Sequence, residues 1–446
     1  MVGAGQPGHI FAGKFKPYSN DDLFKMLGVY IMDGLSPVPQ LLRKMQPQSK
    51  ESTWGNDFIA KHIGLGYEQL YYSFRNFFGV QDPLLHKPQK DCPNWKVDEL
   101  FRWQRFIMKE AWCLAEDFSV DEQTCKMQGR SSYKTRSGRF KRIGDGIQVD
   151  CIADDGYTFD FYFRNEPVDQ RWIDKGMCPM HARLLHMFSN LRDVGHRCNM
   201  DNTFNSVNLA RAGYALPTKV LCQGVIRKSG RGVPPCVVQD EVKGKRADAV
   251  RGTTKVAVLR GDSKSLDLVI GSGYDQKPFY MISHCIEEIT WVEHSKRVWS
   301  RALKMNVDYS FLRWNISHDY NFKMNDNDIA DQLRLVYRIQ RFQRNYKWWF
   351  ALFLWSFEVS LVNAYMMQRR YCELRGIPRK WDHDRFKEAI AKALIDPDGC
   401  WPRRKSPGKL IPSTPAPRRP RDSALRQRTP RIDFNALSPS RGRLNE

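Results

Sequence analysis

The sequence predicts an α+β protein in which a mixed β-sheet flanked by helices forms the core. Three observations support this fold class: a helical pattern from about residue 20 to residue 117, a series of short strand patterns after Asp117, and a second helical pattern from Asn327 onward. The helical segments carry apolar residues at spacings of three and four, as in DDLFKMLGVYIMDGL, which gathers them on one face. The segments before and after the sheet are expected to build one helical domain.

Three short strands are expected in the segments DFSVDEQTC, GDGIQVDCIAD and GYTFDFYF. The third has aromatic residues at every second position from Tyr157 to Phe163, which is the period of a strand. Asp155-Gly156 predicts a tight turn between the second and third strands, because glycine accepts positive φ without strain. A helix over residues 180–193 and a fourth strand over residues 196–201 follow. Three meandering strands, a helix and a fourth strand is the order of an RNase H-like core.

Further β-rich runs between residues 220 and 283 surround a stretch rich in Gly, Pro and Lys. They predict a small β-rich insertion that interrupts the core. The expected organisation is an N-terminal extension (1–19), a helical dimerisation or DNA-binding domain (20–117 and 332–400), an RNase H-like catalytic domain (118–229 and 308–331), the insertion (230–307) and a basic tail (401–446).

The chain is strongly basic, with a formal net charge of +22 and a pI near 9.5. A polyanionic partner is the first physical expectation, and nucleic acid is the leading candidate. Residues 401–446 hold 12 Lys or Arg against 3 Asp or Glu, so the tail and the remaining chain are both basic. We expect this Pro-, Arg- and Ser-rich tail to stay disordered, to hold DNA non-specifically and to serve as a nuclear import signal. The alternative is an unselected remnant of a frameshifted C-terminus.

The eleven cysteines predict buried thiols in a reducing compartment rather than a disulfide framework. They are scattered along a long chain that starts without a basic and then apolar leader. No pair has C-x-x-C spacing, and the intervals match no zinc finger.

Residues 348–367 are largely apolar and long enough to span a bilayer. However, Glu358 and Asn363 lie within this stretch, and both are costly in hydrocarbon. A buried helix is therefore expected, and a membrane is not expected as a partner.

Six short motifs follow one another between about residue 20 and residue 370. They are Ser119-Val120-Asp121-Glu122 with Gly129-Arg130, Asp201-Asn202-Thr203-Phe204-Asn205-Ser206, Gly224-Val225-Ile226-Arg227 with Gly232-Val233-Pro234, Tyr320-Asn321 with Met324, Asp328 and Asp331-Gln332, Lys347-Trp348-Trp349, and Val362-Asn363-Ala364. Each motif alone is weak. In this order and at this spacing the set resembles the motifs of the piggyBac transposase family.

The resemblance implies that Asp121, Asp201 and Asp328 are the catalytic, metal-binding aspartates of a DNA transposase. In-line attack on a phosphodiester requires that charge on both the attacking and the leaving oxygen be neutralised, and two divalent ions roughly 3.5–4 Å apart do this. Mg²⁺ (or Mn²⁺) prefers oxygen ligands and keeps several waters, so three carboxylates and the scissile phosphate suffice. Asp121 would bridge both ions, and Asp201 and Asp328 would each hold one side.

Asp331 lies three residues after Asp328 on the expected helix and would steer a water or ligand from behind the metal ligands. Each of these residues also has an ordinary interpretation. A single aspartate in a strand is usually an edge or turn residue, and Asp328 could be the N-cap of the following helix.

Two basic clusters are candidates for DNA contacts, although a solvated surface is the alternative for both. The first surrounds the first two strands and consists of Lys126, Arg130, Lys134, Arg136, Arg139, Lys141 and Arg142. The second consists of Arg227, Lys228 and Arg231, where the family's target-DNA contacts would fall. The resemblance further implies double-stranded DNA partners, namely transposon ends and a target at TTAA sites. It also implies a nuclear homodimer, because two ends must be processed together.

Two departures from the family pattern support a second hypothesis, a domesticated DNA-binding protein that no longer cuts. The family's Gly-Gly-Val before the third aspartate is replaced by Asn325-Asp326-Asn327. This removes two flexible positions and adds a carboxylate at Asp326 that could compete with the site. The zinc-binding, cysteine-rich module common at the family's C-terminus is also absent from the sequence.

Overall fold

The computed structural model describes most of the chain before residue 400. The described residues are 19–38, 40–49, 53–75, 92–127, 134, 146–241, 252–261, 266–275, 277–284, 289–300, 303–339, 346–379 and 381–399. Contacts divide the chain into two units, Met1–Asp398 and Gly399–Glu446, and every element named below belongs to the first. The predicted basic tail (401–446) lies outside the described residues.

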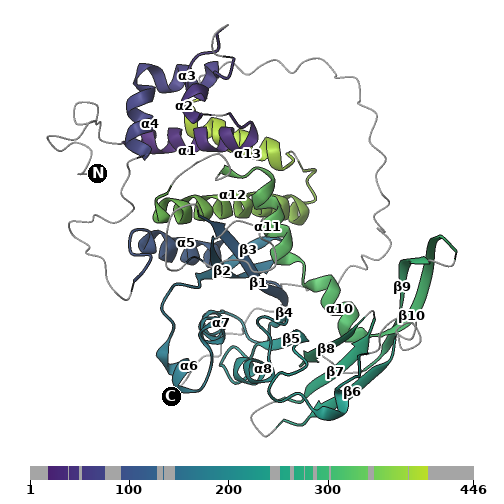
Figure 1. Ribbon diagram of the computed structural model, residues 1–446. Helices are drawn as coiled ribbons and strands as arrows, with labels where there is room; N and C mark the ends of the chain where they lie inside the picture. Colours follow the sequence, from purple (N-terminus) through teal and green to yellow (C-terminus); the bar gives the residue numbers. More distant parts are fainter. Residues whose placement is uncertain are drawn as a thin grey trace, which may run out of the picture. The chain divides into compact units, whose positions relative to one another are not determined.

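The helical pattern before Asp117 forms a series of helices, labelled in Figure 1. These are α1 (Asn20–Leu35), α2 (Leu41–Lys44), α3 (Asp57–Ile63), a short 3-10 turn (Gly64–Gly66), α4 (Tyr67–Arg75) and α5 (Asp98–Ala111). α1 begins at a capping box, in which the Ser19 hydroxyl accepts from the Asp22 amide and the Asp22 carboxylate accepts from the Ser19 amide.

After the sheet, the chain returns to helix and rejoins this first group. These later helices are α10 (Asn315–Lys323), α11 (Asp326–Val336), α12 (Trp348–Arg375) and α13 (His383–Ile395). α13 packs along α1, as Figure 1 shows. A Cβ added at Gly28 of α1 would lie 2.6 Å from the Ile395 side chain, so a glycine permits this close approach.

The central sheet has eight strands in the order β3-β2-β1-β4-β5-β8-β7-β6. Their bounds are β1 Asp117–Lys126, β2 Gly146–Asp154, β3 Tyr157–Phe163, β4 Arg197–Met200, β5 Leu221–Ile226, β6 Thr254–Leu259, β7 Leu268–Tyr274 and β8 Pro278–Ser283. β4 runs parallel to both β1 and β5, whereas the other neighbours are antiparallel. The predicted turn joins β2 to β3, and both of its central residues, Asp155 and Gly156, have positive φ.

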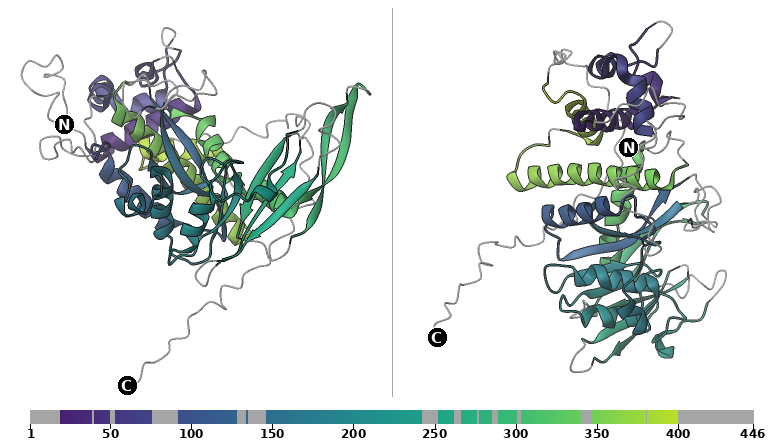
Figure 2. Two further views of the ribbon diagram at one scale, coloured as in Figure 1. Left: turned by 60° about the horizontal axis from the view of Figure 1, so that its bottom comes forward. Right: turned by 90° about the vertical axis from the view of Figure 1, so that its left-hand side faces the viewer.

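The β-rich region after β5, where the sequence predicts an insertion, forms two groups of strands. β6, β7 and β8 continue the main sheet, because β8 pairs with the free edge of β5. Strands β9 (Trp291–Ser300) and β10 (Met305–Trp314), which the sequence analysis did not identify, form a two-stranded ribbon of their own. This ribbon extends away from the sheet in Figures 1 and 2.

The two faces of the sheet are covered by different helices. On one face, the Phe118 ring of β1 meets Phe188 of α7 (Pro179–Ser189). On the other face, β1 contacts α11 and α12, and β3 contacts α5. Figure 2 shows α12 and α5 stacked above the strands, with α7 on the opposite side. The remaining described helices are α6 (Gln170–Asp174), α8 (Val207–Tyr214) and a short 3-10 turn (Pro235–Val237).

α12 is the one described helix that is long and apolar enough to cross a membrane by length and composition, and 78% of its most apolar window is buried inside the protein. Its polar residues have partners in the core. The Glu358 carboxylate accepts from the Arg334 guanidinium at 3.2 Å and from the Ile339 amide at 2.7 Å. The Asn363 side chain exchanges two hydrogen bonds with the Thr158 backbone of β3. α12 is therefore a core helix, as predicted.

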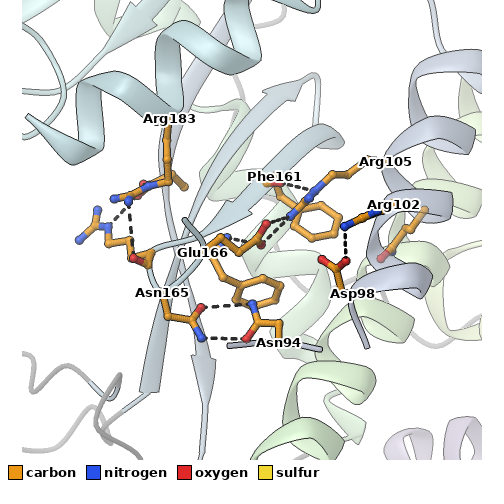
Figure 3. A network of polar contacts seen from close by, with 12 residues as sticks. Asn94, Asp98, Arg102, Arg105, Phe161, Asn165, Glu166 and Arg183 are labelled. Atoms are coloured by element: carbon orange, nitrogen blue, oxygen red, sulfur yellow. Dashed lines mark hydrogen bonds and ion pairs between the residues drawn. The ribbon is translucent and has the colours of Figure 1, made fainter. Parts of the chain in front are cut away.

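A buried polar network fastens α5 to the sheet (Figure 3). Arg105 donates from Nε to the Phe161 carbonyl at 2.8 Å and from Nη2 to both oxygens of Glu166 at 2.5 and 2.7 Å. A second buried ion pair joins α7 to the sheet, in which Arg183 donates to Asp150 of β2 at 3.0 Å. Because each buried charge has an opposite partner, the network holds the helices to the sheet without leaving an uncompensated ion.

Candidate active site

The sheet places the first two predicted catalytic aspartates, Asp121 and Asp201, next to each other. Asp121 is in β1, and Asp201 follows directly after β4. β1 and β4 are parallel, with Val120 opposite Met200, so the residue after each of these partners is an aspartate. Two aspartates far apart in the sequence are thereby brought together by the sheet.

Local backbone contacts orient both carboxylates. Asp121 Oδ1 accepts from the Glu122 amide at 2.7 Å. Asp201 Oδ1 accepts from the Thr203 amide at 2.7 Å, and its Oδ2 accepts from the Thr203 hydroxyl at 3.2 Å. The two bonds from Thr203 to Asp201 stabilise the turn that follows β4.

The close approach of β4 and β5 explains why the third motif has a glycine at position 224. It pairs with Met200, the residue before Asp201, and its φ is +141°. A Cβ at this position would lie 1.9 Å from the Met200 carbonyl oxygen. Glycine is therefore required for β4 and β5 to approach each other beside Asp201.

The third aspartate, Asp328, lies in the first turn of α11. Its neighbour Asn327 is 2% exposed and fixes the helix to the sheet. The Asn327 side-chain amide donates to the carbonyls of Ser119 on β1 and Cys151 on β2, at 3.2 and 3.0 Å, and its backbone amide donates to Ser119 Oγ at 3.3 Å. One of the residues that departs from the family pattern is thus an anchor of the third aspartate.

We expect Asn327→Ala to lower the free energy of unfolding by roughly 2–4 kcal/mol, because two buried side-chain hydrogen bonds that join α11 to the sheet are lost. Chemical denaturation of the purified protein measures this. Asn325→Ala is the matched control, because the Asn325 side chain is exposed and bonds only within its own turn. Equal losses for both variants would contradict the anchoring role.

Electrostatics show that the three aspartates share one environment. Burial, together with the charges of Asp201, Glu122 and Asp328, raises the pKa of Asp121 from 3.8 to about 7, against the opposing effect of the Glu122 amide. The same three aspartates act on Tyr320 of α10. Burial first, and then the charges of Asp201, Asp121 and Asp328, raise the pKa of the Tyr320 hydroxyl. In the sequence Tyr320 stands out only as part of a motif. The fold brings it close to all three carboxylates.

The three carboxylates differ from the buried acids of the core. Asp150 pairs with Arg164, Asp160 with Lys109, and Glu358 with Arg334. Within the part of the chain that the structure describes, no ion pair is found for Asp121, Asp201 or Asp328. Oxygen donors that repel one another and have no basic partner suit a hard divalent cation such as Mg²⁺. Still, no three His, Cys, Asp or Glu side chains among the described residues are arranged as a ready metal site.

Two other acidic residues of α11, Asp331 and Asp326, have neighbours of their own. Asp331, predicted to support the metal ligands, accepts from Arg334 at 2.5 Å. Burial and the charges of Asp154, Asp155 and Asp117 raise the pKa of Asp326 to about 8, although the Asp155 backbone lowers it. Asp326 therefore lies beside the β2–β3 turn, and its charge acts there rather than on Asp121.

The predicted DNA-binding residues are only partly described. Arg227, Lys228 and Arg231 are exposed and follow the carboxyl end of β5, next to the strand that precedes Asp201. Of the first basic cluster, Lys126 ends β1 and Lys134 is half-buried. The cluster's remaining members lie outside the described residues: Arg130, Arg136, Arg139, Lys141 and Arg142.

Comparisons with known proteins agree with this arrangement. A protein-family model described as "Transposase IS4" matches residues 14–365. A cryo-EM structure of a piggyBac transposase synaptic complex with hairpin DNA superposes with a TM-score of 0.63 at 15% sequence identity, covering 88% of this chain and 75% of that one. A search of curated proteins gave no match.

The fold is therefore that of a transposase, a mixed α+β architecture similar to piggyBac transposase. The chain belongs to the transposase IS4 family. The predicted resemblance to piggyBac-type transposases is confirmed.

Proposed function

We propose that the protein is a piggyBac-like DNA transposase that cleaves and joins DNA strands at a site formed by Asp121, Asp201 and Asp328. The observation that carries this proposal is the gathering of three carboxylates that lack an ion pair among the described residues: Asp121 within β1, Asp201 directly after the parallel strand β4, and Asp328 in the first turn of α11. We further propose that β3-β2-β1-β4-β5, with α7 and α8, is an RNase H-like core, and that the strands from β6 to β10 are an insertion into it.

Asp121, Asp201 and Asp328 would hold two Mg²⁺ or Mn²⁺ ions, which neutralise charge on the attacking and leaving oxygens of the phosphodiester. The residues around them keep the carboxylates in place. Thr203 orients Asp201 through two hydrogen bonds, and Asn327 holds the helix that carries Asp328. Burial, and then the charges of the neighbouring acids, raise the pKa of Asp121 and disfavour the metal-free, fully ionised site, so a bound cation would stabilise the ionised carboxylate.

Double-stranded DNA is the proposed partner. The net charge of +22 favours a polyanion, and the similar piggyBac transposase was solved with hairpin DNA. Action on two transposon ends supports a homodimer, and a DNA substrate supports a nuclear location.

DNA nicking tests the proposal. With Mn²⁺ and supercoiled plasmid, the wild-type protein is expected to nick DNA, and EDTA should stop it. Asp201→Asn should reduce the rate at least about a hundredfold, because several kcal/mol of charge stabilisation depends on the ions. Asp193→Asn is the control, since Asp193 is an exposed carboxylate that precedes β4, whereas Asp201 follows it. Equal activity of wild type and Asp201→Asn, or no nicking of several DNAs, would count against the enzyme.

The second candidate function is DNA binding without cleavage. It is favoured by the segment Asn325-Asp326-Asn327 before Asp328, which replaces the family's Gly-Gly-Val. The affinity that phosphate contacts provide falls steeply as the salt concentration rises, and these contacts do not need a metal ion. Salt-dependent DNA binding that is unchanged by EDTA and by Asp201→Asn, with no nicking, would select this function.

A further inference from the structure

A small cavity opens beside Asp201, on the side away from Asp121's strand. It has a volume of about 230 Å³ and lies between two loops and the start of α7. One loop follows β4 and carries Asn202, Thr203 and Asn205; the other follows β5 and carries Arg227 and Arg231. Cavities for drug-sized ligands usually have about 300–1,000 Å³, so this one suits a single small ring system rather than an extended segment.

The cavity is lined by both apolar and polar side chains. Apolar side chains from four segments line it, namely Met180, Val207, Ile226 and Val233. His181 also lines the cavity, and burial lowers its pKa, so the imidazole is neutral near pH 7. The lining contains no carboxylate, and its two cations, Arg227 and Arg231, are exposed. A bare phosphate would not need the apolar walls, whereas a flat aromatic ring would contact them.

Asn205 supplies the second observation. The residue is 5% exposed and lines the cavity, yet neither its amide nitrogen nor its amide oxygen has a hydrogen-bond partner among the described residues. Leaving a buried amide without partners costs free energy. An adjacent donor and acceptor match the edge of a nucleobase, as in the two-point contact between Asn and adenine.

We propose that this cavity receives one unpaired nucleobase of the DNA strand, with the Asn205 amide bonded to the base edge and Arg227 and Arg231 at the flanking phosphates. Enzymes that extrude a base hold it between apolar or aromatic side chains and hydrogen-bond its edge. The cavity shares the loop after β4 with Asp201, so the base would belong to a nucleotide next to the cleaved bond. The inference rests on the proposed function, since it requires DNA at the three aspartates.

The test compares two DNAs that differ by one base. A hairpin duplex with a single unpaired adenosine, and the same duplex with an abasic residue there, are titrated against the full-length protein by fluorescence anisotropy. The wild type should bind the adenosine hairpin about five- to tenfold more tightly, as a two-point base contact provides. Asn205→Leu should abolish this difference and leave abasic binding unchanged. Arg227→Gln should weaken both DNAs to the same extent.

Asn208→Leu is the matched control, because Asn208 is exposed on α8 and does not line the cavity. Asn205→Ser serves as a second variant if Asn205→Leu does not fold. The inference is overturned if wild type binds both hairpins equally, or if either Asn205 variant that folds keeps the preference for the base. Absence of binding to any DNA would instead overturn the proposed function.

Discussion

Asp121→Asn is expected to make the metal-free protein more stable at pH 8, by roughly 2–4 kcal/mol. In the folded state the pKa of Asp121 is raised from 3.8 to about 7, so the ionised carboxylate opposes folding once the pH exceeds its unfolded-state pKa. Each pKa unit corresponds to about 1.4 kcal/mol. The wild type therefore loses stability as the pH rises from about 4 to 7, and asparagine does not.

Thermal or chemical unfolding at pH 5 and pH 8, in EDTA, measures this effect. The gap between variant and wild type should grow from pH 5 to pH 7 and stay constant above. Asp193→Asn, which removes an exposed carboxylate, should show no such growth. A destabilised Asp121→Asn at pH 8, or a gap that does not depend on pH, would contradict the raised pKa of Asp121 in the folded state.

Glu358→Leu is expected to lower the free energy of unfolding by about 3–5 kcal/mol. The substitution leaves the Arg334 guanidinium, which is 1% exposed, without its partner on α12. It also removes the acceptor of the Ile339 amide. Since Arg334 lies on the helix that carries Asp328, we also expect weaker binding of divalent ions. Urea unfolding and isothermal titration with Mn²⁺ measure the two effects.

Glu373→Leu is the control, on the same helix. Glu373 pairs with Arg379 at the surface, and such exposed ion pairs contribute about 1 kcal/mol or less. Comparable losses for Glu358→Leu and Glu373→Leu would show that the buried pair is not what fixes α11 to α12.

The strands around Asp121 could be predicted because local patterns determine them. Aromatic alternation from Tyr157 to Phe163 and the Asp155-Gly156 turn specify a hairpin without long-range information. The core helix was predictable for a related reason, since Glu358 and Asn363 are costly in lipid but find partners in a protein core.

Other features depend on contacts that spacing does not encode. Among the described strands, β9 and β10 pair with each other and with no other strand. One face of the ribbon is exposed, so the sequence carries no alternation of buried and exposed residues that marks these strands. The sequence also did not reveal which strand edge β8 would join.

The roles of the residues directly before Asp328 also could not be predicted from the sequence. Its departure from the family pattern suggested a disturbed loop with a competing carboxylate. In the structure Asn327 instead anchors α11 through Ser119 and Cys151, and Asp326 lies beside the β2–β3 turn. Neither role follows from residue type alone, because both depend on which face of α11 meets the sheet.

Counting the bound metal ions tests the central claim most directly. Titrating Mn²⁺ into the protein bound to hairpin DNA, with electron paramagnetic resonance to measure the free ion, should show two saturable ions per chain in the wild type. Asp121→Asn should lose this binding, whereas Asp193→Asn should keep it. Wild-type protein without saturable Mn²⁺, or Asp121→Asn with the same two ions, would contradict a metal site at Asp121, Asp201 and Asp328.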